Sequence, residues 1–123
     1  MATVAWAVGR KKTLTIANGQ TETDVLDLGA YPTPRSGKTG AKAYRDLNIT
    51  IQGPATLGGT VTVQVCDTEA GTYTALQSGG ADVTVPAAKT TPVVPISSRF
   101  MKLVSSGAES GGKNFIVTGH IRR

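Results

Sequence analysis

Few side chains in this sequence could perform metal or thiol chemistry. The chain of 123 residues has one histidine, His120, and one cysteine, Cys66. A zinc site of the usual kind needs four ligands drawn mainly from Cys and His, so these two residues cannot build one. A single cysteine also cannot form a disulfide within the chain, so nothing indicates an oxidising compartment. We therefore predict neither a metal nor a cofactor.

Three patterns that resemble catalytic or nucleotide-binding motifs are incomplete. Residues 36–39 read Ser-Gly-Lys-Thr, the end of a phosphate-binding loop, but Pro32 stands where that motif requires glycine. His120 lies on a predicted strand, and no serine has the local signature of a nucleophile. Asp67 and Glu69 are close in sequence, but they lie in a predicted turn, where Asp commonly bonds to the backbone. Glycoside hydrolysis would need two acids that flank a sugar. We therefore expect no enzyme.

The elements that must position these residues are short β-strands. Apolar and polar residues alternate along several segments, which is typical of half-buried strands, and no ten-residue window has a helical stripe. Breakers such as Asn18-Gly19 and Gly79-Gly80 separate them. The pattern predicts an all-β, antiparallel β-sandwich of the jelly-roll kind. The predicted strands are 14–17, 23–28, 47–51, 61–65, 72–76, 82–86, 91–96, 99–105 and 115–121.

Two segments do not follow the strand pattern. Residues 1–12 are small and weakly alternating and end in Arg10, Lys11 and Lys12, so they are predicted as an N-terminal arm or a first strand. Residues 29–43 contain three basic residues and no acid, and this length is unusual for a connection within a compact domain. We therefore predict one sandwich domain over residues 13–123, with a long basic loop.

The net charge of +5 is unevenly distributed along the chain. Residues 1–45 carry +4, residues 46–98 carry −3, and residues 99–123 carry +4. This layout favours contact with an acidic protein surface at one end of the domain. Nucleic-acid modules usually add exposed aromatic side chains to basic ones, and only 5% of this chain is aromatic, so we expect no direct nucleic-acid partner.

No membrane span or secretion signal is expected. No apolar run reaches the ~18 residues that a spanning helix needs. The basic residues near the N-terminus follow the mildly apolar stretch, whereas a signal peptide has them in front of it. These observations predict a protein made in the cytoplasm without a signal peptide and without a membrane partner.

Six segments between Tyr44 and the C-terminus carry a resemblance to a known family. Each is a predicted strand or the turn beside one: Arg45–Ile51, the Gly58-Gly59 turn with Thr60–Val65, Asp67–Tyr73, Asp82–Val85, Pro95–Leu103 and Asn114–Ile121. In this order the chain resembles the small capsid cement, or decoration, proteins of tailed phages. The resemblance covers about two thirds of the chain and rests on pattern and composition.

The resemblance implies a non-enzymatic virion structural protein. Such a protein would be a homo-oligomer, a dimer or trimer, on the outer capsid surface, where it would bridge major capsid subunits and stabilise the shell. Arms and long loops suit this role, because they add contact area to a small body. In this interpretation Trp6 anchors the arm, and basic residues meet carboxylates on the shell. The expected contact residues are Trp6, Arg10, Lys11, Lys12, Tyr31, Arg35, Lys38, Lys42, Arg122 and Arg123.

Two alternatives to a capsid-binding protein remain. The same pattern fits a tail or head-fibre domain of a virion. A receptor- or glycan-binding sandwich is also possible, and it predicts that Tyr31, Tyr44 or Tyr73 is exposed in a concave patch. An enzyme would instead need a cleft with two carboxylates at catalytic separation.

Overall fold

The protein is built from β-strands throughout the part of the chain that the structure describes. A computed structural model describes residues 3–4, 11–28, 47–96 and 98–121. The strands are β1 (Thr3–Val4), β2 (Lys11–Ile16), β3 (Val25–Asp27), β4 (Leu47–Gln52), β5 (Val61–Cys66), β6 (Thr74–Ala75), β7 (Gln77–Ser78), β8 (Ala81–Asp82), β9 (Thr84–Val85), β10 (Val94–Pro95), β11 (Phe100–Ser105) and β12 (Lys113–Ile121).

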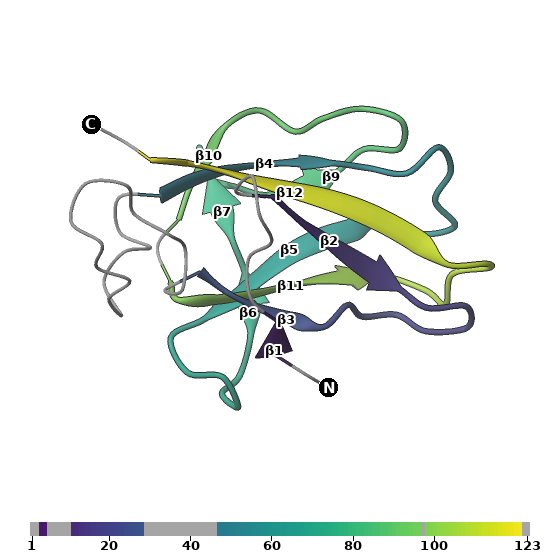
Figure 1. Ribbon diagram of the computed structural model, residues 1–123, viewed down its shortest axis with the longest axis horizontal. Helices are drawn as coiled ribbons and strands as arrows, with labels where there is room; N and C mark the ends of the chain where they lie inside the picture. Colours follow the sequence, from purple (N-terminus) through teal and green to yellow (C-terminus); the bar gives the residue numbers. More distant parts are fainter. Residues whose placement is uncertain (1–2, 5–10, 29–46, 97, 122–123) are drawn as a thin grey trace.

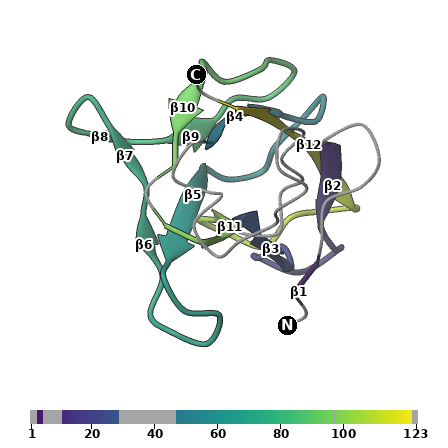
Figure 2. The same cartoon turned by 60° about the vertical axis from the view of Figure 1, so that its left-hand side comes forward.

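Two sheets face each other across one core (Figures 1 and 2). The first has the strand order β1-β3-β11-β5-β6, and β9 also pairs with β5. The second has the order β10-β4-β12-β2. All pairings are antiparallel except the short parallel one between β1 and β3. We call these the six-stranded and the four-stranded sheet. The structure thus confirms the predicted all-β, antiparallel sandwich-like fold.

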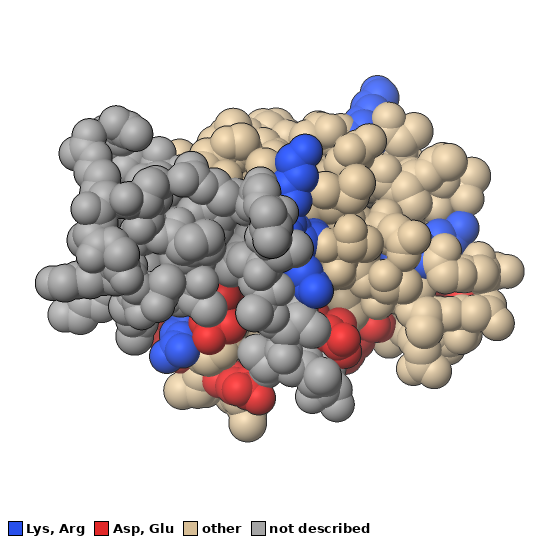
Figure 3. Space-filling view, viewed as in Figure 1, with Lys and Arg blue, Asp and Glu red and all other residues tan. Residues whose placement is uncertain are grey.

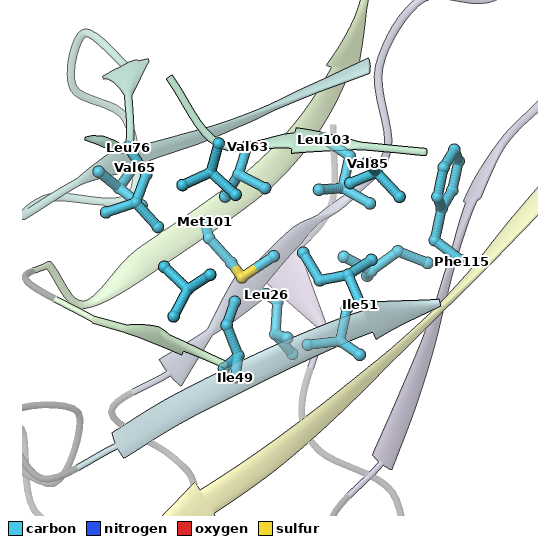
Figure 4. Close-up of a cluster of buried hydrophobic side chains, with 14 of the residues drawn as sticks. Leu26, Ile49, Ile51, Val63, Val65, Leu76, Val85, Met101, Leu103 and Phe115 are labelled. Carbon is cyan, nitrogen blue, oxygen red and sulfur yellow. The ribbon is translucent and has the colours of Figure 1, made fainter. Parts of the chain in front are cut away.

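Alternating residues of the strands build the core (Figure 4). In β5 the three valines at 61, 63 and 65 are buried, and the residues between them are half-buried. The opposite sheet contributes Ile49, Ile51, Phe115 and Val117, each at most 1% exposed. Because side chains of a strand point alternately to its two faces, this spacing buries one face of each sheet and leaves the other facing outward.

Two glycines form the turn of the β7–β8 hairpin. Strands β7 and β8 are joined by Gly79 and Gly80, both of which have positive φ angles. Two consecutive residues with positive φ are typical of a two-residue hairpin turn, and glycine adopts this conformation without a steric penalty. The Gly-Gly pair that the sequence marked as a strand breaker is therefore the turn of a hairpin.

All nine predicted strands overlap a strand of the structure. The hairpin of β7 and β8 was not predicted as a separate element. Within the segment predicted as an arm or first strand, Thr3–Val4 pairs with β3, and β2 begins at Lys11. Lys11 and Lys12 therefore belong to a strand of the four-stranded sheet.

The alternation predicts that substitutions at a buried and at an exposed strand position will differ in their effect on stability. Leu103 on β11 is 0% exposed, and Ile116 on β12 is 38% exposed. Leu103→Ala should lower the free energy of unfolding by about 2–5 kcal/mol, because it leaves a cavity in the core. Ile116→Ala should lower it by about 1 kcal/mol or less. Urea unfolding with unchanged m-values measures both, and equal losses at the two positions would contradict this assignment of faces.

Candidate binding surface

The two ends of the sandwich are built differently. At one end the chain crosses between the sheets through the connections β2–β3, β4–β5 and β11–β12 (right in Figure 1), and the β9–β10 connection crosses there as well, where Thr90 pairs with Gln52 at the end of β4. We call this the Glu109 end. At the opposite end β3 stops at Asp27, β4 starts at Leu47 and β12 stops at Ile121. We call this second end the basic end, for the reason given below.

A single buried glutamate joins three of the four connections at the Glu109 end, namely β2–β3, β4–β5 and β11–β12. Glu109 is 1% exposed, and its Oε1 accepts a hydrogen bond from the Gly58 backbone N–H at 2.8 Å. Its Oε2 accepts bonds from the Gly59 N–H at 3.0 Å and from Ser105 Oγ at 2.7 Å. Its own backbone bonds to Gly19 and Gln20 of the β2–β3 connection. One residue of the β11–β12 connection therefore holds the β2–β3 and β4–β5 connections.

These hydrogen bonds favour the ionised form of the carboxyl group. The backbone N–H of Gly58, followed by the Ser105 hydroxyl, holds the pKa of Glu109 below its ordinary value, against the opposite effect of burial. Gly59 must remain glycine here, because a Cβ at this position would lie 2.7 Å from the hydroxyls of both Ser105 and Ser106. The turn and the carboxylate thus require each other.

Two basic segments of the sequence join the described strands at the opposite end. Leu47, the first residue of β4, pairs with Ile121, the last residue of β12. Residues 29–46 join the chain just before Leu47, and they carry four basic residues and one acid. Arg122 and Arg123 follow Ile121 directly. Strand pairing therefore places the junctions of the two basic segments next to each other.

The charges of the described residues also sort by sheet. Lys11, Lys12 and Lys113 lie on the four-stranded sheet, whose described strand residues include no Asp or Glu. The six-stranded sheet and its connections carry most of the acids, with two basic residues, Arg99 and Lys102. In Figure 3 the red side chains lie along the lower part of this face with one blue group beside them, and the other blue groups lie above. The acids of this sheet and of the β7–β8 hairpin are Glu22, Asp24, Asp27, Asp67, Glu69 and Asp82.

Only two of the predicted contact residues lie within the described residues. Lys11 is exposed and Lys12 is half-buried, and both lie near the start of β2. Lys11 pairs with Thr118, three residues before the end of β12, so both lysines lie toward the basic end. The other predicted contacts, which are Trp6, Arg10, Tyr31, Arg35, Lys38, Lys42, Arg122 and Arg123, lie outside the residues that the structure describes.

Both basic side chains of the six-stranded sheet are already paired. Arg99 donates two hydrogen bonds to Asp27, Nε to Oδ1 and Nη2 to Oδ2, both at 3.0 Å. Lys102 Nζ lies 3.0 Å from Glu22 Oε1 and 4.7 Å from the centre of the Tyr73 ring. Charges held in such pairs are less available to a partner. The partners are up to 80 residues apart in sequence, and no local pattern indicated them.

The residues considered for catalysis do not come together. His120 is exposed on the four-stranded sheet, with Nε2 3.3 Å from Thr50 Oγ1. Asp67 and Glu69 are exposed in the turn after β5. Within the described ranges, no three His, Cys, Asp or Glu side chains form a group that could hold a metal ion.

Tyr73 is the one of the three tyrosines considered for sugar binding that lies within the described residues. Both its ring and its hydroxyl contact other groups of the chain. Its hydroxyl donates a hydrogen bond to the Glu69 carbonyl at 2.8 Å, and its ring contacts the Lys102 ammonium group. Burial, with the nearby charges of Cys66 and Glu69, raises the pKa of the Tyr73 hydroxyl. Tyr31 and Tyr44 lie outside the described residues.

Comparisons with protein-family models, curated proteins and solved structures find no match to this chain. In the described part of the chain, no helix is long and apolar enough to cross a membrane.

Replacing Glu109 should destabilise the fold through its hydrogen bonds. In Glu109→Gln one acceptor oxygen becomes an NH₂ group that faces the Gly58 or Gly59 N–H. We expect the free energy of unfolding at neutral pH to fall by about 1–3 kcal/mol, because a buried N–H loses its acceptor. Glu69→Gln is the matched control at an exposed site and should change it by about 0.5 kcal/mol or less. Similar effects for both variants in urea unfolding would contradict the assigned role.

The stability should also depend on pH through Glu109. Because the pKa of Glu109 is lower in the folded state than its ordinary value of 4.5, its contribution is fully present above that value. The contribution disappears as the pH falls through the lower, folded-state pKa. The difference in unfolding free energy between wild type and Glu109→Gln should therefore shrink as the pH is lowered below 4.5. A difference that stays constant down to the lowest accessible pH would refute this.

Proposed function

We propose that the protein is a non-enzymatic virion structural protein that binds the outer surface of a capsid and stabilises the shell by bridging major capsid subunits. The proposal includes self-association as a dimer or trimer. It also includes a jelly-roll form of the sandwich, with residues 1–12 as an attachment arm. The resemblance to capsid decoration proteins of tailed phages suggests this function, and the layout of charge at the basic end supports it.

The pairing of Leu47 with Ile121 is the observation that carries the proposal. Arg45, Arg122 and Arg123 lie within two residues of this pair in the sequence. Residues 29–46 and 122–123 together contribute a net charge of +5. A cation-rich end of this kind complements an acidic protein surface.

The opposite end favours this interpretation because it is fixed by internal bonds. Glu109 joins three of the four connections there through side-chain and backbone hydrogen bonds. A scaffold that is rigid at one end can present loops and termini for binding at the other.

The alternative functions have less support. A tail or head-fibre protein could use the same basic end, and it would differ in which virion component it binds. A receptor- or glycan-binding module would need an open aromatic platform. Tyr73, the described candidate, has the Lys102 ammonium group against its ring.

Truncating the N-terminal segment tests the arm. Deletion of residues 1–9 leaves β2 intact and removes the two-residue pairing of β1 with β3. The truncated chain should remain folded, because every core residue identified among the described residues lies in the part that remains, from Leu14 onward. It should fail to bind capsids purified from the phage whose genome encodes the chain. Co-sedimentation measures binding, and normal occupancy by the truncated chain would disprove the role of the arm.

Matched charge reversals test the basic end. Lys38→Glu and Arg122→Glu should each weaken capsid binding several-fold, with a loss that shrinks at high salt because the interaction is between exposed charges. Lys89→Glu is the control with the same change in net charge. Lys89 is exposed, and its carbonyl accepts a hydrogen bond from Gly53 just after β4, near the Glu109 end. Equal losses for all three variants would contradict binding through the basic end.

A further inference from the structure

Strand β2 has an unpaired edge. It is the last strand of the four-stranded sheet and pairs along its whole length with β12. Among the described residues, no backbone hydrogen bond joins Lys11–Ile16 to any element on the other side. The other described strands at sheet edges, β1, β6, β9 and β10, have two residues each. β2 therefore presents the longest row of free backbone donors and acceptors in the described fold.

A polar groove lies beside the end of β2. It has a volume of about 570 Å³ and is lined by Thr15, Ala17 and residues 20–24. Glu22 and Asp24 are part of this lining, and Lys11 and Lys12 stand at the other end of the strand. One edge thus has basic side chains at its start and acidic ones at its end.

We propose that two copies of this chain associate through β2, which pairs antiparallel with its own copy about a two-fold axis. Antiparallel pairing brings Lys12 of each copy, which lies on the same face of β2 as Leu14 and Ile16, to the groove that Asp24 of the other copy lines. Parallel pairing would instead place lysines beside lysines, which is unfavourable. An edge whose charges run from basic to acidic is complementary to itself only in the antiparallel sense.

The burial pattern of β2 limits the register. Thr13 and Thr15 face outward, and Leu14 and Ile16 face the core. A two-fold axis perpendicular to the sheet keeps outward residues opposite outward ones, so it is centred on one residue of each strand. The register centred on Leu14 lies near the middle of the strand and places Thr13 opposite Thr15. Lys12 then lies opposite Ile16, beside the groove. The two four-stranded sheets become one continuous sheet of eight strands.

The expected association is weak. Edge pairing of about five residues on each chain buries less than the ~1,000 Å² of a stable interface, so we expect a dissociation constant on the order of 10 µM. Lysines on a free edge also discourage pairing with strands that lack matching acids. This inference makes the proposed self-association specific, and it is independent of capsid binding, because it is tested without capsids.

Sedimentation velocity of the full chain between about 1 and 200 µM tests the dimer. Wild type should change from monomer to dimer over this range. Lys12→Glu should raise the dissociation constant about tenfold, because two-fold symmetry makes the reversal act twice. Adding Asp24→Lys to Lys12→Glu should restore dimerisation, since Asp24 is exposed and can form the reversed pair. Lys89→Glu, with the same change in net charge, should leave the constant unchanged.

Amide hydrogen exchange locates the interface in the same samples. Peptides that contain residues 11–16 should exchange more slowly at high than at low concentration, and peptides from β6 to β8 should not change. A monomer at every concentration would overturn the proposal. So would a dimer that Lys89→Glu weakens as much as Lys12→Glu, or one whose concentration-dependent protection excludes β2.

Discussion

The fold depends on one buried carboxylate. An all-β chain whose strands alternate between two sheets must cross from one sheet to the other repeatedly, and each crossing leaves backbone N–H groups without a strand partner. The Glu109 carboxylate accepts hydrogen bonds from two such groups, the N–H groups of Gly58 and Gly59. Its own backbone is hydrogen-bonded to the β2–β3 connection. A charged acceptor is well suited here, since it forms shorter and stronger hydrogen bonds than a neutral one and can accept several at once. These bonds thereby fix the position of one sheet relative to the other at this end of the molecule.

This arrangement explains why the two ends can differ so strongly in character. The strands extend from the Glu109 end as a packed core, in which the inward residues of both sheets are almost completely buried. The described residues at the opposite end are held by other bonds: Arg99 donates two hydrogen bonds to Asp27, and its carbonyl accepts one from the Leu28 N–H. The basic segment 29–46 follows Leu28 directly in the sequence. In the proposed function, the bonds that stabilise the Glu109 end are therefore separate from the charges that would bind a partner.

The strands and turns could be predicted from sequence because their signals are local. Alternation within five or six residues and glycine pairs between them correctly located nine strands. The role of Glu109 could not be predicted from the sequence. It lies in a loop of Gly, Ser and Ala, and its carboxylate oxygens accept hydrogen bonds from residues about 50 positions away. The same holds for the pair of Asp27 and Arg99, which are 72 positions apart. The net charge of each sequence segment also gave no sign of how charge is distributed between the sheets. Residues 1–45 are basic as a whole, but their acids Glu22, Asp24 and Asp27 lie on the six-stranded sheet and its connections, together with Asp67 and Glu69.

Edge pairing through β2 would give the basic ends a defined spacing. Antiparallel strands related by a two-fold axis point the basic ends of the two copies in opposite directions along the joined sheet. Leu14 pairs with Phe115, six residues before Ile121, and a strand advances about 3.4 Å per residue. The two basic ends would thus lie about 40 Å apart.

A dimer of this shape cannot place both ends on one small acidic patch, but it can contact two neighbouring subunits of a shell. Even a weak dimer is then favoured on the shell, because the second contact becomes intramolecular once the first has formed. In the proposed function, the open edge of β2 would thus set the distance over which a dimer could bridge capsid subunits.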